Sequence, residues 1–343
     1  MTPRERVVAS IRRGPTDALP WQFDMTSAIR AKLRHYYQTE DLLTATGDHL
    51  VWTGLGTPRG YVPPAAAPGL YRTEFGAVWR REARDTQIGD WGDLIDYPLK
   101  EPSLAGYAFP DGSAPGRADH VPLARQRYPD HFLVVSGPSL FEAAWALCGF
   151  ENYLAYVMAE PAFVGELTGR LAEFHCAQIA QLAGTNVDAV RLGDDWGFQD
   201  RLMVRHETWR RLFRESYRRV FEAVHRVCPF VMLHSCGNIT DILPDLIDVG
   251  LDVVHPLQPE AMDVERCQRE FGRDITFWGG LGCQSTLPLG TPADVRAEVR
   301  HRLRLFAGGG YILAPAGAVP TDTPVENVVA IIEEAKGQLG DRA

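Results

Sequence analysis

Short apolar runs, many of them β-branched, alternate with longer amphipathic stretches from residue 130 onward. The runs show almost no polar alternation, which is typical of strands buried on both faces of a parallel sheet. Six strands are predicted there, at His131–Ser136, Asp188–Gly193, Phe230–His234, Asp252–His255, Ile275–Trp278 and Gly310–Leu313. Two further apolar runs, Leu19–Phe23 and His49–Trp52, bring the predicted total to eight strands.

The stretches between these runs have the spacing and the end signals of helices. One apolar stripe is predicted from Trp209, Leu212, Phe213, Val220, Phe221 and Val224. Two later helices are expected to begin with a threonine, a proline and an acid in the capping-box position, at 291–294 and 323–326. The glycines at 308–310 are expected to turn the chain into the last strand.

Eight strands alternating with helices predict an α/β fold, a (β/α)8 barrel of the TIM type that forms one domain over residues 1–343. A doubly wound open sheet is the alternative. Residues 54–128 interrupt the alternation, because they are rich in glycine and proline. Their aromatic residues are Tyr61, Tyr71, Phe75, Trp79, Trp91, Tyr107 and Phe109. We expect this segment to be an ordered insertion that forms a lid over one end of the barrel.

The composition is ordinary for a globular protein, with 45% hydrophobic and 23% charged residues and a net charge of -9. This charge argues against a nucleic-acid partner, because binding to phosphates requires a basic face. No apolar run reaches the roughly 20 residues of a membrane-spanning helix, and the first residues lack the apolar core of a signal peptide. The six cysteines show no spacing typical of a disulfide framework. We therefore expect a cytoplasmic protein with reduced thiols.

The most informative polar residues stand at the end of the predicted strand Phe230–His234. His234 and Cys236 are two positions apart, and because the side-chain period of a strand is two, both point the same way. An imidazole and a thiolate on one side of a strand end make half of a zinc site. Plain packing is the alternative, since cysteine is among the most buried residue types. The sequence has neither a nucleophile elbow nor an HExxH helix.

Enzymes built on α/β barrels place their reactive residues at the C-terminal ends of the strands. The candidate catalytic residues at these ends are Asp194, Asp195, His234 and Gln258, of which Gln258 would hold a substrate amide or carboxylate. The candidates for substrate binding are Asp24, Trp196, Asn238 and Trp278. Each has a structural alternative, because aspartate and asparagine also cap helices and turns, and tryptophan also packs in cores. The adjacent Asp194 and Asp195 are expected to diverge, with at least one of them capping a helix.

Six short motifs carry a resemblance to a known family. They are residues 193–197 (GDDWG), 234–238 (HSCGN), 256–259 (PLQP), 277–280 (FWGG), 309–315 (GGYILAP) and 324–327 (PVEN). With them, residues 130–336 resemble the uroporphyrinogen decarboxylase superfamily. The corrinoid-dependent methyltransferase branch is more similar than the decarboxylases themselves. The family fold is a (β/α)8 barrel, in agreement with the strand count, whereas residues 1–130 match only loosely.

One departure from the family pattern bears on the substrate. True uroporphyrinogen decarboxylases carry an arginine-rich N-terminal motif that binds the porphyrinogen carboxylates. The corresponding residues 21–27 (WQFDMTS) contain no arginine. Without such a cationic clamp, a substrate with many carboxylates is not expected.

A second departure bears on the metal. Family members that form methyl-coenzyme M bind zinc through H-x-C on one strand and a further cysteine near the end of the last strand. His234 and Cys236 match the first two ligands, but the last strand ends in residues 314–318 (APAGA) without a cysteine. Cys283, after the preceding strand, is the candidate replacement. The resemblance also implies a corrinoid cofactor, methylcobalamin, carried by a separate protein.

The resulting hypothesis is a methyltransferase that moves a methyl group between a small methoxylated or methylated substrate and a corrinoid protein. Asp194 or Asp195, together with His234 and Gln258, would orient and protonate the departing heteroatom. A zinc ion, if present, would act as a Lewis acid. Two alternatives remain. One is a decarboxylase of a small carboxylic acid that uses Asp24 or Asp194, and the other is a non-catalytic protein that binds corrinoids or tetrapyrroles.

Overall fold

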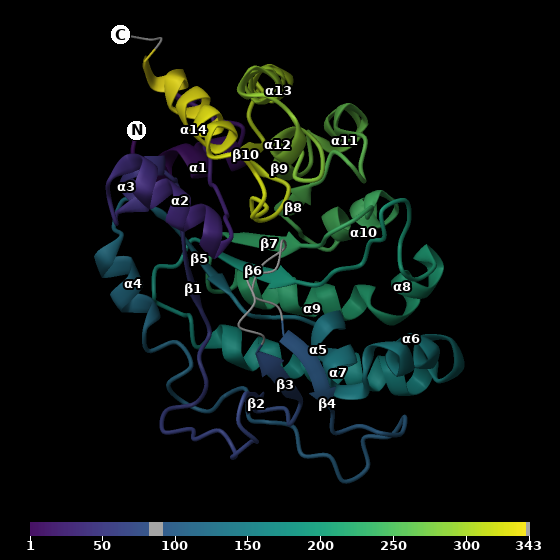
Figure 1. Cartoon of the computed structure of the whole chain (residues 1–343). Helices are drawn as coiled ribbons and strands as arrows, with labels where there is room; N and C mark the ends of the chain where they lie inside the picture. Colours follow the sequence, from purple (N-terminus) through teal and green to yellow (C-terminus); the bar gives the residue numbers. More distant parts are fainter. Residues whose placement is uncertain (82–91, 341–343) are drawn as a thin grey trace.

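Seven parallel strands form the central sheet of the computed structural model, which describes residues 1–81 and 92–340 (Figure 1). In order across the sheet they are β1 (Leu50–Gly54), β5 (Phe132–Ser136), β6 (Ala189–Gly193), β7 (Phe230–His234), β8 (Val253–Leu257), β9 (Thr276–Leu281) and β10 (Tyr311–Pro315). This order follows the chain without a reversal. It therefore excludes the doubly wound sheet, whose strand order reverses at a switch point.

Helices connect the strands and pack against the outer side of the sheet (Figure 1). The helices before β5 are α1 (Pro3–Ile11), α2 (Ser27–Tyr37), α3 (Leu42–Thr46) and α4 (Val121–Arg127). Those between β5 and β7 are α5 (Phe141–Cys148), α6 (Phe150–Ala159), α7 (Pro161–Ala180), α8 (His206–Leu212) and α9 (Arg214–His225). The later helices are η1 (Thr240–Ile242), α10 (Leu243–Asp248), α11 (Val264–Phe271), α12 (Thr286–Leu289), α13 (Pro292–Leu305) and α14 (Val325–Gly340).

The sheet curls around an inner hydrophobic core to which all seven strands contribute. The members of this core from the strands are Leu50, Phe132, Val134, Ala189, Phe230, Met232, Val253, Trp278, Ile312 and Ala314. Val7 and Ile11 of α1 complete it. The Ser10 hydroxyl of α1 donates to the carbonyl of Tyr311, the first residue of β10. Helix α1 therefore closes the N-terminal end of the curled sheet and leaves the C-terminal strand ends for the loops.

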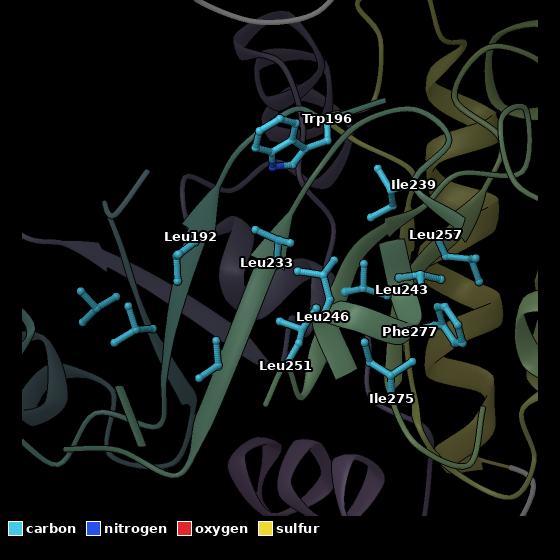
Figure 2. Close-up of a cluster of buried hydrophobic side chains, with 14 of the residues drawn as sticks. Leu192, Trp196, Leu233, Ile239, Leu243, Leu246, Leu251, Leu257, Ile275 and Phe277 are labelled. Atoms are coloured by element: carbon cyan, nitrogen blue, oxygen red, sulfur yellow. The ribbon is translucent and has the colours of Figure 1, made fainter. Parts of the chain in front are cut away.

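Alternate strand residues point outward and form a second core with the helices. Figure 2 shows part of this core, with Leu192 and Leu233 on neighbouring strands, Leu243 and Leu246 on α10, and Trp196 above them. Apart from Trp196 these side chains are leucines, one of the residue types most often found fully buried. The two-sided burial explains why the strands lack polar alternation, as the sequence predicted.

The predicted strand at residues 19–23 is reduced to a single bridge between Trp21 and β10. On its other side, the N–H of Trp21 donates to the His49 imidazole over 3.2 Å, and the N–H of Phe23 donates to Asp48 over 3.1 Å. Because these donors bond to side chains rather than to the backbone of β1, no ladder forms. A cavity of about 260 Å³ lies between the segment and β1. The predicted α/β fold with a parallel sheet is confirmed, but the closed eight-stranded barrel is not.

The insertion at residues 54–128 contains a small antiparallel sheet, in the order β2 (Leu70–Arg72), β3 (Val78–Arg81) and β4 (Gly92–Asp96). Its aromatic side chains pack on the helices after β5. The Phe75 ring lies 4.8 Å from that of Phe174 on α7, and the Trp79 ring lies 5.7 Å from that of Trp145 on α5. Trp91 lies outside the described residues. The assignment of this segment as a lid, and of the whole chain as one barrel domain, stays a prediction.

The sequence signals predicted to start two helices and to turn the chain into the last strand are confirmed in part. Thr291 and Asp294 form the predicted capping box of α13, and Gly309 and Gly310 adopt positive φ before β10. The second predicted box is wrong, because the Thr323 hydroxyl is buried without a hydrogen-bond partner. The predicted stripe of 209–224 is divided between α8 and α9. Within the described ranges, no helix is both long and apolar enough to cross a membrane.

Candidate metal and substrate site

The loops after β6 and β7 lie in backbone contact at two glycines of the sequence motifs. A Cβ at Gly197 would lie 2.5 Å from the backbone nitrogen of Asn238, and a Cβ at Gly237 would lie 2.3 Å from the carbonyl oxygen of Gly197. Gly237 also has a φ of +80°, which favours glycine. The N–H of Gly197 donates to the carbonyl of Cys236 over 3.1 Å. This close approach places Asp195 beside Cys236.

Three groups able to bind a metal meet where these loops touch. Asp195, His234 and Cys236 offer a carboxylate oxygen, an imidazole nitrogen and a sulfur that lie within 4.8 Å of one another. His234 Nε2 lies 3.5 Å from Asp195 Oδ1 and 3.5 Å from Cys236 Sγ. Asp195 Oδ1 also accepts a hydrogen bond of 2.8 Å from the Cys236 N–H, which fixes the carboxylate. All three side chains are half-buried at the C-terminal ends of β6 and β7.

His255 on β8 orients the imidazole of His234, since their Nδ1 atoms lie 2.7 Å apart. Burial lowers the pKa of His234 to about 4. Burial and the neighbouring His234 hold the pKa of His255 well below its usual value. Both rings are therefore neutral at pH 7, and one Nδ1–H donates to the other Nδ1. When His234 is the donor, its Nε2 lone pair faces Asp195 and Cys236, and this is the tautomer of a metal ligand.

The donor set and its spacing fit a zinc ion. Burial, reinforced by the charge of Asp195, raises the pKa of Cys236 to about 12, so the free thiol is protonated at neutral pH. A metal ion displaces this proton, because the thiolate is the ligand. A tetrahedral zinc ion places neighbouring N, O and S ligand atoms about 3.3–3.7 Å apart. Both 3.5 Å separations around His234 fall in this range.

Cys283, predicted as the third ligand, does not belong to this group. Its thiol lies after β9, 4.0 Å from the carbonyl oxygen of Gly317. In the described part of the chain, the cluster of metal-binding groups contains Asp195 in its place. The geometry therefore offers a carboxylate from the β6 loop where the family pattern has a cysteine.

Asp194 points away from this group, toward the helices. Its side chain is fully buried, and its two oxygens accept hydrogen bonds at the N-terminus of α5. The five donors are the backbone N–H groups of Leu140, Phe141 and Glu142 and the hydroxyls of Ser139 and Tyr217. The adjacent aspartates thus diverge, and Asp194 is a helix cap. We assign it no chemical step.

Three other candidate residues make contacts within the protein. Gln258 Oε1 accepts a 2.9 Å hydrogen bond from the N–H of Gly237, and Asn238 Oδ1 accepts one of 3.1 Å from the N–H two residues later. Both therefore stabilise the loop after β7. Asp24 is exposed and pairs with Arg30 over 3.4 Å. Their contacts with a substrate remain predictions.

The two candidate tryptophans lie on opposite sides of the sheet. Trp196 is fully buried and belongs to the outer hydrophobic cluster (Figure 2). Its Nε1–H donates to the Tyr217 hydroxyl over 2.7 Å. Trp278 lies on the inner side, where its ring stacks on Trp52 with 5.2 Å between centroids. Its ring also lies 4.2 Å from that of His255. Trp278 is therefore on the same side as His234, and Trp196 is a core residue.

Two ionisable residues of this region were not predicted from the sequence. The first, Arg191, stands in the middle of β6, and its guanidinium carbon lies 4.8 Å from the centroid of the Trp52 ring. Burial lowers the pKa of Arg191, whereas the charges of Asp24 and Asp195 act in the opposite direction. An arginine inside the otherwise apolar strand 189–193 (AVRLG) was the available signal.

The second is Glu142, in the first turn of α5. Burial, then the charges of Asp194 and Asp195, raise the pKa of Glu142 to about 8. Glu142 therefore holds a proton at neutral pH. No motif marks this residue, because only the fold brings α5 close to the loop after β6.

A model of the uroporphyrinogen decarboxylase (URO-D) family matches residues 117–338. The chain belongs to the uroporphyrinogen decarboxylase family. The match covers the segment 130–336, in which the motifs lie, and it includes Asp195, His234 and Cys236. The family resemblance predicted from those motifs is confirmed.

Curated relatives include two methylcobamide:CoM methyltransferases (MtaA) of Methanosarcina barkeri. The first is 24% identical over 145 residues, which are 42% of this chain and 40% of the relative. The second, from strain Fusaro, is 24% identical over 161 residues, which are 47% of this chain and 45% of the relative. The chain thus matches less than half the length of these curated relatives.

Two solved structures share the fold of this family member. A methyltransferase from Methanosarcina mazei aligns with 98% of this chain and 99% of its own, with a TM-score of 0.74 and 16% identity. A B12-independent methionine synthase from Shewanella sp. W3-18-1 aligns with 91% of this chain and 89% of its own, with a TM-score of 0.51 and 11% identity. At these identities the likeness concerns the fold alone.

Proposed function

We propose that this family member transfers a methyl group between a small methoxylated or methylated compound and the corrinoid of a separate protein. The observation that carries this proposal is the cluster of Asp195, His234 and Cys236 at the strand ends. The similarity of the chain to methylcobamide:CoM methyltransferases supports a corrinoid as the reaction partner. The lack of arginine in residues 21–27 weighs against porphyrinogen decarboxylation.

Asp195, His234 and Cys236 would hold a zinc ion. Such an ion supplies a Lewis acid that stabilises negative charge on a bound heteroatom. When His234 donates its Nδ1–H to His255, its Nε2 is free to act as a ligand. Gln258 holds the Gly237 backbone and thereby the loop that carries Cys236. The chain's own contribution is thus to fix the ligands in place before the substrate binds.

Demethylation also requires a proton. When the bond between the methyl group and an ether oxygen breaks, the oxygen keeps the electron pair and must be protonated. Glu142 holds a proton at neutral pH, and its charge state is coupled to those of Asp195 and Cys236. We therefore assign Glu142 as the proton donor to the departing oxygen.

The pH dependence of demethylation tests this assignment of Glu142. Because the raised pKa of Glu142 keeps the acid protonated only below about pH 8, the rate is expected to fall about tenfold per pH unit above that value. Glu142→Gln is expected to be slow and to lose this decline. The control Glu166→Gln, at an exposed position of α7, should keep the wild-type profile. A Glu142→Gln profile identical to that of the wild type would remove Glu142 from the mechanism.

The proposed function itself is tested by mixing the purified protein with reduced cobalamin or a reduced corrinoid protein and a panel of methoxyaromatics, methoxy acids and methylamines. Formation of methylcorrinoid, followed by visible absorbance, is the expected result. Release of carbon dioxide from an acid without any methylcorrinoid would establish the decarboxylase alternative. Corrinoid binding without turnover across the panel would favour the non-catalytic alternative.

A further inference from the structure

The guanidinium of Arg191 is a polar group on the inner side of the sheet, beside the metal-binding cluster. Its strand neighbours Val190 and Leu192 belong to the outer core, so the period of two directs Arg191 inward. The side chain as a whole is half-buried and acts electrostatically on Asp195 and Cys236. Arg191 and His234 of the cluster therefore face the same inner side of the sheet.

One hydrogen-bond donor of Arg191 has no acceptor in the described part of the chain. Its Nε–H is buried and has no hydrogen-bond partner in the described residues. Its guanidinium carbon lies over the Trp52 ring at 4.8 Å. This cation–π contact compensates part of the charge, but it leaves the Nε–H, which lies in the guanidinium plane, without an acceptor among the described residues. Buried donors without partners are rare in native proteins and call for an explanation.

The acidic groups near Arg191 are engaged elsewhere. Asp195 Oδ1 accepts a backbone N–H and faces the His234 imidazole. Asp24 is exposed and pairs with Arg30. Since the described residues supply no acceptor for the Arg191 Nε–H, a bound molecule is able to supply one.

We propose that Arg191 is an anion subsite that binds a carboxylate of the substrate, so that the methylated substrate is a small organic acid. An arginine presents paired N–H donors that match the two oxygens of a carboxylate. One such arginine suits one carboxylate, in keeping with the missing arginine-rich motif at 21–27. As an assignment of substrate class, this subsite rests on the proposed methyl transfer.

Calorimetric titration of the purified protein, without any corrinoid, measures this subsite directly. The probes are methoxyacetate and 4-methoxybenzoate, each paired with its uncharged amide. At least one acid is expected to bind about tenfold or more tightly than its amide, because hydrogen bonds to charged groups are the stronger ones. Arg191→Gln is expected to abolish this preference, and Arg191→Lys, which keeps the charge without the paired donors, to retain a smaller one.

Arg218→Gln is the matched control, since it removes the same charge from the exposed face of α9. It should bind both acids as the wild type does. Thermal unfolding of each variant checks the fold, and Arg191→Lys together with the acid–amide comparison in the wild type decides the matter if Arg191→Gln does not fold. The proposal is overturned if neither acid binds more tightly than its amide, or if a folded Arg191→Gln keeps the preference.

The binding experiment tests the anion subsite and the methyl-transfer assay tests the proposed function, so either proposal can be refuted without the other. Acid binding that depends on Arg191, without methylcorrinoid formation from any compound, would refute the proposed function and leave the subsite. Methyl transfer from uncharged donors as fast as from acids, without an acid preference in binding, would refute the subsite and leave the proposed function.

Discussion

Cys236→Ala is expected to abolish zinc retention and methyl transfer together while the fold stays intact. Wild-type protein should hold about one zinc per chain. Loss of an outer-shell partner already lowers metal affinity or activity about 10–100-fold, so loss of a ligand should reduce activity at least about a hundredfold. The fold should survive, because the Cys236 backbone N–H still bonds to Asp195. Elemental analysis beside an activity measurement checks both effects.

Cys283→Ala and Asp195→Ala test which residue is the third metal ligand. The structure indicates Asp195, whereas the sequence predicted Cys283. Cys283 is a half-buried cysteine outside the cluster, so its alanine variant should keep zinc and activity. Asp195→Ala should lose zinc as Cys236→Ala does. Zinc loss in Cys283→Ala with retention in Asp195→Ala would restore the third ligand expected from the sequence. Full activity in both Cys236→Ala and His234→Ala would remove β7 from the mechanism.

The strands were predictable because their burial on both faces leaves a strong local signal. Each of the seven strands begins within one residue of its predicted start, as in β7 (Phe230–His234). Their ends were less predictable, since β9 continues through Gly279 and Gly280 to Leu281. Pairing with β8 and β10 sustains the strand there, and a single sequence does not report that pairing.

The failure of the eighth strand was only partly visible in the sequence. Residues 19–23 (LPWQF) are mostly apolar, but Pro20 has no N–H to donate to a ladder. Whether the run joins a sheet also depends on the acceptors to which its other N–H groups bond. In the structure Trp21 and Phe23 donate to the side chains of His49 and Asp48, about 25 residues further along the chain. Hydrogen bonds between residues this far apart in the chain produce no periodic pattern of apolar residues in the sequence.

Two of the three residues of the metal cluster were predictable from the sequence, and the third was not because a tertiary contact places it. His234 and Cys236 lie on one strand end, so the period of two sufficed to bring them together. Asp195 joins them through the contact between Gly197 and Gly237, which belong to different loops. The sequence marked both adjacent aspartates but not which one faces the cluster, because that choice depends on where α5 packs.

Asp194→Ala is expected to destabilise the protein severely. The substitution leaves five buried or half-buried donors without their acceptor, including three backbone N–H groups at the start of α5. Removing one partner from a buried charged network costs about 3–5 kcal/mol of unfolding free energy. Urea unfolding should show a lower midpoint with an unchanged slope. Asp194→Asn should also be destabilising, because its amide NH2 cannot accept from these donors.

Asp195→Ala is the matched control at the neighbouring position. Asp195 is half-buried and accepts one backbone hydrogen bond, so its loss should cost only about 1 kcal/mol. The adjacent aspartates should therefore separate two effects, with Asp194 governing stability and Asp195 governing zinc and activity. A stable, inactive Asp194→Ala protein would instead give Asp194 the chemical role first expected from the sequence. In that case its hydrogen bonds to α5 would serve to position a reactive carboxylate rather than to cap a helix.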